Sequence, residues 1–410
     1  MHNKLAINLG WNSEGVIEEN YYEWLNTCKK YNISFVRIFL CSWSINALYN
    51  TKYITILNNI INYAFQKKIE VCLVLNNFVD YNVKNYLDIN DKRFSWLSNP
   101  YYSKYKNQKI FFQTLDKKYL NDVVKILKII YKYDNVKYIE VMNEIDQIHC
   151  SNKILINWTN LLINNLTKTF LDRYIYTCSI SNYELLSKFK DKMNCYVDLH
   201  IYSFPYENAI ENIEYIINKH NITYLGEYAK HSDSSHLNSI DSKRYFISGL
   251  WGSYFYGLQY TPMHWWWKET LCNSEYLKFI DMYNLISSKL DNVKDVKKVT
   301  IQYHIANESI VDNRIEKNKI KERLNNLLKH PLFIINEFKS IKKFIVKKSI
   351  KQHKVILRKI LFNNNYIYYL ECSNDIIIEE KLHKKHIIDL ATGEKRKYNK
   401  KIAKGNYLIF

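Results

Sequence analysis

The chain has 410 residues, 47% of them hydrophobic, which is enough for one large domain with a sizeable core and a smaller second domain. Its formal net charge is +19, but residues 281–410 hold 28 basic and 14 acidic side chains, so roughly +14 of that charge lies in this part. Lysine is much commoner than arginine, which argues against a protein that reads bases, and no stretch approaches the roughly 18 apolar residues of a membrane span.

Eight short apolar runs recur along the first 280 residues and predict β-strands. They are Leu5–Gly10, Phe35–Leu40, Val71–Leu75, Tyr138–Met142, Ile175–Cys178, Tyr196–His200, Thr223–Gly226 and Gln259–Trp265. Amphipathic stretches between them predict helices at Asn20–Tyr31, Ile54–Lys67, Asp116–Tyr133, Ile154–Leu171, Tyr206–His220 and Ser239–Tyr256. Because parallel strands need crossover connections, this alternation predicts a (β/α)8 barrel over residues 1–290. An open doubly wound sheet would need a glycine-rich phosphate-binding turn after the first strand, and the sequence has none there.

The third strand is followed by a long connection, residues 76–115, that is rich in Tyr, Trp and Asn. Long connections at the carboxyl end of a barrel strand are usually functional or disordered, and the aromatic content argues against disorder. We therefore expect this connection to form a wall of a cleft.

The pattern changes after residue 290. Residues 291–350 predict a basic helical or linker segment with a helix at Ile315–Leu328, and residues 351–410 predict a small β-rich appendage. Its predicted strands and turns are Val355–Phe362, Asn363–Asn365, Tyr366–Cys372, His386–Leu390, Thr392–Glu394 and Asn406–Phe410. The fold class is therefore α/β, a (β/α)8 barrel followed by a small C-terminal β-rich domain.

The eight cysteines show neither a C-x-x-C pair nor the spacing of metal ligands. Four of them fall in or beside apolar runs: Cys41, Cys72, Cys178 and Cys195. We expect free, buried thiols of a reducing compartment and no metal. Because Met1–Lys4 leads directly into an apolar run rather than into a secretory leader, a soluble cytoplasmic protein is expected, or a secreted one if a leader was trimmed.

Polar and aromatic residues gather where five of the predicted strands end. They are Arg37 on the second strand, Asn143 and Glu144 after the fourth, His200 and Tyr202 at the sixth, Glu227 at the seventh, and Trp265 and Trp267 at the eighth. The carboxyl ends of barrel strands converge on one face, so these side chains are expected to meet there. A retaining glycosidase needs two carboxyl groups about 5–5.5 Å apart, and Glu144 and Glu227 could provide them.

This ordered set resembles the clan A glycoside hydrolases, and most closely the family-five-like enzymes of the cellulase and mannanase type, over about two thirds of the chain. The resemblance implies that Glu144 is the acid/base and Glu227 the nucleophile. It also implies support of the nucleophile by Arg37 and Tyr202, a 2-hydroxyl contact for Asn143, a subsite contact for His200, and sugar stacking by Trp265 or, since it shares a face at strand spacing, Trp267. The chain departs from many relatives at residues 76 and 77, which are both Asn.

The function predicted on this basis is a retaining O-glycoside hydrolase that cleaves β-linked glycosides or polysaccharides by double displacement, without a cofactor. Its expected partner is a carbohydrate substrate, with neither nucleic acid nor a membrane span, and the basic tail could hold an anionic glycan or polymer. Two alternatives remain open. One is a carbohydrate-binding barrel that has lost catalysis, and the other is a polyanion-binding protein that acts through its lysine-rich tail.

Overall fold

The computed structural model describes residues 3–10, 18–39, 51–82, 96–203, 208–220, 222, 224–231, 234–290, 294–299, 303–305, 355–362, 365–379, 382 and 384–410. The chain divides into two compact units. The first holds Met1–Phe204 and Ala209–Asn284, and the second holds Pro205–Asn208 and Leu285–Phe410.

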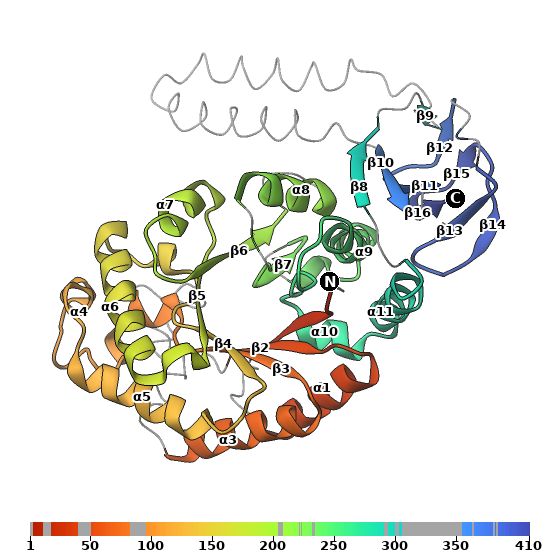
Figure 1. Cartoon of the computed structure of the whole chain (residues 1–410). Coiled ribbons are helices and arrows are strands. Elements are labelled where there is room, and N and C mark those ends of the chain that lie inside the picture. The colour runs from red at the N-terminus through yellow and green to blue at the C-terminus, as the bar shows by residue number, and fades with distance from the viewer. Residues whose placement is uncertain are drawn as a thin grey trace, which may run out of the picture. The chain divides into compact units, whose positions relative to one another are not determined.

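The first unit is a parallel barrel whose strands follow one another in chain order and are ringed by helices (Figure 1). The strands are β1 Ala6–Leu9, β2 Phe35–Phe39, β3 Glu70–Val74, β4 Val136–Glu140, β5 Ile175–Ile180, β6 Tyr196–Tyr202 and β7 Glu227–Ala229. The helices are α1 Glu18–Lys30, α3 Thr51–Gln66, α4 Gln108–Gln113, α5 Lys117–Ile130, α6 Asn152–Phe170, α7 Leu186–Lys190, α8 Ala209–His220, α9 Ile240–Phe255, α10 Trp267–Cys272 and α11 Ser274–Ser287. The predicted (β/α)8 barrel fold is therefore confirmed.

The predicted eighth strand closes the barrel without forming a continuous ladder. Residues 259–264 reach β1 through isolated parallel bridges from Tyr260 to Lys4 and from His264 to Ile7, and His264 also bridges to Tyr228 on β7. The side-chain amide of Asn8 donates to the carbonyl oxygens of both Gly226 and Met263, at 2.9 Å each. Side-chain hydrogen bonds thus replace part of the backbone pairing that a regular eighth strand would make.

The barrel interior is apolar toward the amino-terminal ends of the strands. One buried cluster fills it: Ala6, Phe35, Cys72, Tyr138, Tyr224, Tyr260 and Met263. We call this cluster the lower layer. Residues two positions further along a strand point to the same side, and on β1, β2 and β4 these residues are Asn8, Arg37 and Glu140, all fully buried. The interior therefore changes from apolar to polar within two residues of strand.

The long connection at residues 76–115 is folded more compactly than predicted. Its described part contains two short 3-10 helices, Phe78–Tyr81 and Trp96–Ser98, as well as α4. Tyr81 packs against Trp96 and Phe111 at ring distances of 5.9 and 5.6 Å, and Phe111 in turn lies 5.8 Å from Trp158 on α6. These rings are buried among one another, so in the described part the aromatic content serves packing and does not form the predicted wall of a cleft.

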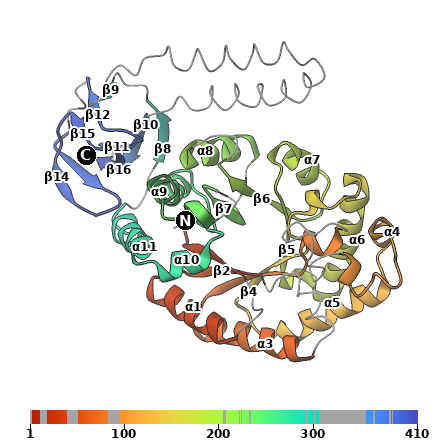
Figure 2. The same cartoon turned by 180° about the vertical axis from the view of Figure 1, so that it is seen from behind.

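The second unit consists of antiparallel sheets (Figure 2). Six strands pair in the order β14 Lys395–Lys397, β13 His386–Asp389, β16 Gly405–Ile409, β11 Asn365–Cys372, β10 Val355–Phe362 and β8 Lys294–Lys298. Three more pair in the order β15 Lys401–Ile402, β12 Ile376–Ile378 and β9 Tyr303–Ile305. The predicted β-rich appendage is confirmed, while the predicted helix at Ile315–Leu328 lies outside the described residues.

Of the four cysteines expected to be buried thiols, Cys72 and Cys178 are free and buried, and Cys195 is free and half-buried. Cys41 lies outside the described residues. Within the part of the chain that the structure describes, no helix has the length and apolar character to cross a membrane.

Candidate active site

Arg37 on β2 organises the polar part of the barrel interior. Its Nε and one terminal nitrogen bind both carboxylate oxygens of Glu140 at 2.6 and 2.8 Å, and both side chains are fully buried. Further hydrogen bonds of the guanidinium reach Asn8 Oδ1 at 2.9 Å, Asn143 Oδ1 at 2.8 Å and Glu227 Oε1 at 3.1 Å. A buried cation with this set of acceptors both compensates the charge of Glu140 and orients the residues above it.

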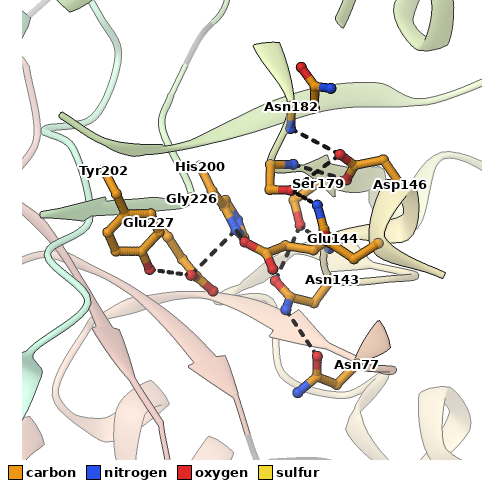
Figure 3. A network of polar contacts seen from close by, with 12 residues as sticks. Asn77, Asn143, Glu144, Asp146, Ser179, Asn182, His200, Tyr202, Gly226 and Glu227 are labelled. Atoms are coloured by element: carbon orange, nitrogen blue, oxygen red, sulfur yellow. Dashed lines mark hydrogen bonds and ion pairs between the residues drawn. The ribbon is translucent and has the colours of Figure 1, made fainter. Parts of the chain in front are cut away.

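Glu227 is the first residue of β7, rather than following the strand as the sequence indicated. Its Oε1 accepts from Arg37 at 3.1 Å, and its Oε2 accepts from the Tyr202 hydroxyl at 2.7 Å, as Figure 3 shows for the Tyr202 contact. Burial and the charge of Glu144 raise the pKa of this carboxyl above its ordinary value, and Arg37 and the Tyr202 hydrogen bond lower it only in part. The hydrogen bonds therefore favour the ionised form against the cost of burial.

Glu144 follows β4 and faces the same site (Figure 3). Its backbone has φ 48° and ψ 52°, a left-handed conformation that is uncommon for a residue with a side chain, and its N–H donates to Ser179 Oγ at 2.9 Å. Burial, with a further contribution from the charge of Asp146, raises the pKa of Glu144 to about 8. Glu144 is therefore protonated at neutral pH, in contrast to the support that Glu227 receives for its charge.

His200 lies between the two glutamates. Its Nδ1 is 2.9 Å from Glu144 Oε1 and 3.4 Å from Glu227 Oε2, and the ring is buried. One carboxylate oxygen of each glutamate and one ring nitrogen of His200 lie within 4.8 Å of one another. The structure thus brings together the acid/base candidate, the nucleophile candidate and the predicted histidine.

Asn143 is held in a fixed orientation beside Glu144. Its Oδ1 accepts from Arg37, and its Nδ2 donates to Asn77 Oδ1 at 3.1 Å (Figure 3). Asn76 instead points into the packing, where its amide donates to the Tyr119 hydroxyl at 2.6 Å and to the Val141 carbonyl oxygen at 2.8 Å. Of these two neighbouring asparagines, Asn77 therefore contacts the site with its side chain, whereas Asn76 reaches Asn143 only through its backbone carbonyl oxygen.

The two tryptophans differ from one another. Trp265 is half-buried, whereas Trp267 is only 7% exposed and packs edge-on against Trp24 of α1 at a ring distance of 6.0 Å. A Cβ atom on Gly10 would come within 2.4 Å of the Trp267 ring. Trp267 begins α10, so strand alternation does not place it on the face of Trp265. Trp267 is a core residue in this structure, and Trp265 remains the predicted stacking residue.

Three further residues belong to the site region, although the sequence interpretation assigned them no role. Glu140 binds Arg37, and Ser179 on β5 lies 2.7 Å from Glu140 and accepts the Glu144 N–H. Asp198 on β6 is buried two residues before His200. The signal that could have found them is the alternation of polar residues on the inner face of apolar strands, because an ionisable group there is costly unless it is paired.

Among the described residues, two groups of side chains have donors that a cation could use: Glu140 with Asp198 and His200, and Glu144 with His200 and Glu227. Both carboxylate oxygens of Glu140 are already bound by Arg37, and the Glu227 oxygens accept from Arg37 and Tyr202. The charge of these carboxylates is thus compensated by a guanidinium and a hydroxyl, and we assign neither group as a metal site.

No protein-family model and no curated protein matches the chain. Among solved structures, an endo-β-1,4-mannanase from Thermotoga petrophila is similar with a TM-score of 0.51 and 12% identity, over 72% of this chain and 79% of that chain. An exo-β-1,4-mannosidase from Opitutaceae bacterium strain TAV5 is similar with a TM-score of 0.50 and 9% identity, over 70% of this chain and 60% of that chain. At these identities the similarity concerns the fold, and the first unit has the barrel fold that this mannanase and this mannosidase also have.

Proposed function

We propose that the protein is a retaining O-glycoside hydrolase that acts on β-linked glycosides or polysaccharides. The observation that carries the proposal is the approach of Glu144 and Glu227, whose oxygens lie within 4.8 Å of each other and of a His200 ring nitrogen. Retaining enzymes hold their carboxyl groups about 5–5.5 Å apart, while inverting enzymes need roughly 6.5–9.5 Å to admit a water molecule. The short separation supports double displacement.

The two carboxyl groups have environments that suit different roles. Glu227, with hydrogen bonds from Arg37 and Tyr202, attacks the anomeric carbon as a carboxylate and forms a glycosyl ester. Glu144, whose pKa is raised to about 8, gives its proton to the glycosidic oxygen as the bond to the leaving group breaks. The Glu144 carboxylate then takes a proton from the water that hydrolyses the ester, which restores both residues.

The surrounding residues support a sugar as substrate. We propose that Asn143, oriented by Arg37 and Asn77, contacts the 2-hydroxyl, and that His200 makes a subsite contact. The half-buried Trp265 would offer its ring to an apolar sugar face. Because the fold is shared with a β-1,4-mannanase and a β-1,4-mannosidase, β-1,4-linked mannan and mannosides are the first substrates to test, followed by glucan and galactan.

The test is a screen of the full chain and its Glu227→Ala variant against aryl β-glycosides and β-linked polysaccharides. We expect turnover by the natural chain and a loss of about 10⁴-fold or more in the variant, because the variant lacks the carboxylate proposed to form the ester. Glu70→Ala is the matched control, since Glu70 pairs with Lys4 at the amino-terminal end of β3 and belongs to a partly exposed ion pair. Sugar binding without turnover across the whole panel would instead indicate a carbohydrate-binding barrel that has lost catalysis.

Covalent trapping distinguishes the mechanism from the activity alone. A 2-deoxy-2-fluoro glycoside with a good leaving group slows both steps, and hydrolysis of the ester becomes slow enough for the adduct to accumulate. We expect the mass of one sugar on the peptide that contains Glu227. A burst of leaving group with the label on another residue, or direct formation of product with inverted configuration, would contradict double displacement.

We further propose that the basic C-terminal part holds an anionic glycan or polymer. In the described part, β14 presents Lys395, Arg396 and Lys397, all of them exposed. Retention on a sulfated or carboxylated polysaccharide should weaken steeply as salt rises from 50 to about 300 mM, because exposed charges are screened. Retention that does not depend on salt, or that is unchanged by replacing these three residues with Gln, would exclude this binding mode.

A further inference from the structure

Asp198 is a buried carboxyl group for which the reaction just described has no use. It lies on β6 two residues before His200 and four before Tyr202, so the three side chains point to the same side of the strand. Asp198 is 2% exposed, and neither of its carboxyl oxygens has a hydrogen-bond partner among the described residues. The same holds for Nε2 of the buried His200. Two unpaired polar groups side by side in a core are costly unless they serve each other.

The Asp198 carboxyl group and His200 Nε2 both lie beside Gly226. A Cβ atom on Gly226 would lie 2.1 Å from Asp198 Oδ2 and 3.0 Å from His200 Nε2, so both atoms crowd the same face of this glycine. An oxygen of Asp198, an oxygen of Glu140 and a ring nitrogen of His200 lie within 4.8 Å of one another. Since Nδ1 of His200 already faces Glu144 and Glu227, Nε2 is the nitrogen that remains for Asp198.

The charges around Asp198 argue that it is neutral. The described part of the barrel interior brings four carboxyl groups, those of Glu140, Glu144, Asp198 and Glu227, near one guanidinium, that of Arg37. Both oxygens of Glu140 are bound by Arg37, and Glu227 accepts from Arg37 and Tyr202. A third carboxylate here would have no partner for its charge.

The other titratable groups that face Asp198 offer no positive charge. They are Cys72 on β3, Cys178 on β5, Cys195 before β6 and Tyr224 before β7, and burial raises the pKa of each, so all four are neutral. Burial also raises the pKa of Asp198, and the charge of Glu140 raises it further. Burial lowers the pKa of His200, which is therefore neutral and carries a single ring proton.

We propose that Asp198 is a positioning residue that, as a neutral carboxylic acid, donates a hydrogen bond through one bridging water molecule to His200 Nε2 and thereby holds the ring proton on Nδ1. The Nδ1–H group then donates to the oxygens of Glu144 and Glu227. With the proton on Nε2, a lone pair would instead face both carboxyl groups, repel the carboxylate of Glu227 and compete for the proton of Glu144.

The expected effect of Asp198 on catalysis rests on the proposed function, whereas the expected protonation states of Asp198 and His200 do not. The first measurement is a ¹H–¹⁵N spectrum of the histidine side chains at pH 7, with the His200 signals assigned by their loss in His200→Gln. We expect a neutral ring with the proton on Nδ1 and an Nε2 signal shifted by an accepted hydrogen bond. A proton on Nε2 would mean that Asp198 is an ionised acceptor and would overturn the proposal.

Two variants sharpen the test. Asp198→Asn keeps a neutral group that can donate, so we expect the same His200 signals, kcat/KM within about 3-fold of the natural chain, and unmoved limbs of the pH profile. Asp198→Leu keeps the approximate volume without a donor, so the Nε2 signal should move to that of a free acceptor and kcat/KM should fall at least about 10-fold. If Asp198 were ionised, Asp198→Asn would remove a negative charge and shift both limbs to lower pH.

The outcomes separate this proposal from the proposed function. Expected His200 signals in a protein that cleaves no glycoside would uphold the role of Asp198 while the glycosidase assignment fails. Turnover with unchanged His200 signals in Asp198→Leu would leave the glycosidase standing and overturn the positioning role. If Asp198→Leu does not fold, as judged by circular dichroism, the natural chain and Asp198→Asn still decide between the neutral and the ionised carboxyl.

Discussion

The two levels of the barrel interior differ sharply in chemistry, although the same strands build both. The lower layer of aromatic and small side chains includes Phe35 and Tyr138, and two residues further along β2 and β4 stand Arg37 and Glu140. Phe35 and Tyr138 pack edge to face at a ring distance of 5.6 Å, whereas Arg37 and Glu140 form a bidentate ion pair. The lower layer stabilises the barrel through buried apolar surface. The polar level above it, which begins with Asn8, Arg37 and Glu140 and which we call the upper level, contains groups that are costly to bury.

This difference indicates that the polar groups of the upper level serve a purpose other than stability. Replacing a buried ion pair by apolar residues of similar volume is often neutral or stabilising, so stability alone does not account for the upper level. Burial raises the pKa of both of its glutamates, that of Glu144 to about 8, while Glu227 alone accepts hydrogen bonds from Arg37 and Tyr202. Buried carboxyl groups with shifted pKa values and different hydrogen-bond partners are typical of active sites.

The largest effect is expected at the upper level from Glu144→Gln. The amide cannot supply a proton, so kcat/KM on a substrate with a poor leaving group should fall by about 10²–10⁴-fold. In the natural chain, activity should decline as pH rises through about 8, where Glu144 loses its proton, and this decline should disappear in the variant. A pH series of kcat/KM checks both, and full activity of the variant would remove Glu144 from the mechanism.

Arg37→Met should lower the free energy of unfolding by about 3–5 kcal/mol, because it leaves the buried charge of Glu140 without compensation. Urea unfolding measures this loss. The double variant Arg37→Met/Glu140→Gln removes both charges and should recover part of the stability without recovering activity. Equal stability of the single variant and the natural chain would show that the upper level is not under this electrostatic constraint.

Tyr202→Phe removes the 2.7 Å hydrogen bond to Glu227 and with it a group that favours the carboxylate. The pKa of Glu227 should rise, so the acidic limb of the kcat/KM profile should move to higher pH, because the nucleophile must be ionised to attack. We expect a loss of about 10-fold near neutral pH. An unmoved acidic limb would mean that another group governs it.

The smallest effect is expected in the lower layer from Tyr138→Phe. The Tyr138 hydroxyl lies 3.5 Å from the Tyr260 hydroxyl, a weak contact, so the free energy of unfolding should change by less than about 1 kcal/mol. Both limbs of the pH profile should stay in place. A shift as large as that of Tyr202→Phe would show that the lower layer and the polar level above it are coupled.

Local pattern was sufficient for much of the architecture. The sequence predicts strand β10 with the bounds that the structure shows, Val355–Phe362. Each predicted helix of the barrel is present, and its ends differ from the predicted ends by a few residues. These elements were predictable because alternation and helical periodicity are set by neighbours in the chain. The predicted seventh strand, Thr223–Gly226, was misplaced because the apolar run precedes the residues that pair with β6, which are Glu227–Ala229.

The candidate site likewise has features that the sequence predicts and features that it does not. Arg37, Glu144, His200, Tyr202 and Glu227 were named from strand ends and do converge. The roles of the two tryptophans could not be separated, because the helix that begins at Trp267 turns that ring into the core. The aromatic content of the connection at 76–115 predicts a cleft wall, but composition does not tell whether rings face solvent or, as Tyr81, Trp96 and Phe111 do, one another.

The sequence by itself determined the alternation of strands and helices, the change of character after residue 290, and the residue types at the strand ends, because each depends on local periodicity or composition. Only the tertiary structure decided which buried groups share a proton or a charge. The bidentate pairing of Arg37 with Glu140, the hydrogen bond from the Glu144 N–H to Ser179 and the burial of the unpaired Asp198 carboxyl all depend on elements far apart in the chain. Protonation follows from burial and from the distance between charges, and both exist only once the barrel has closed.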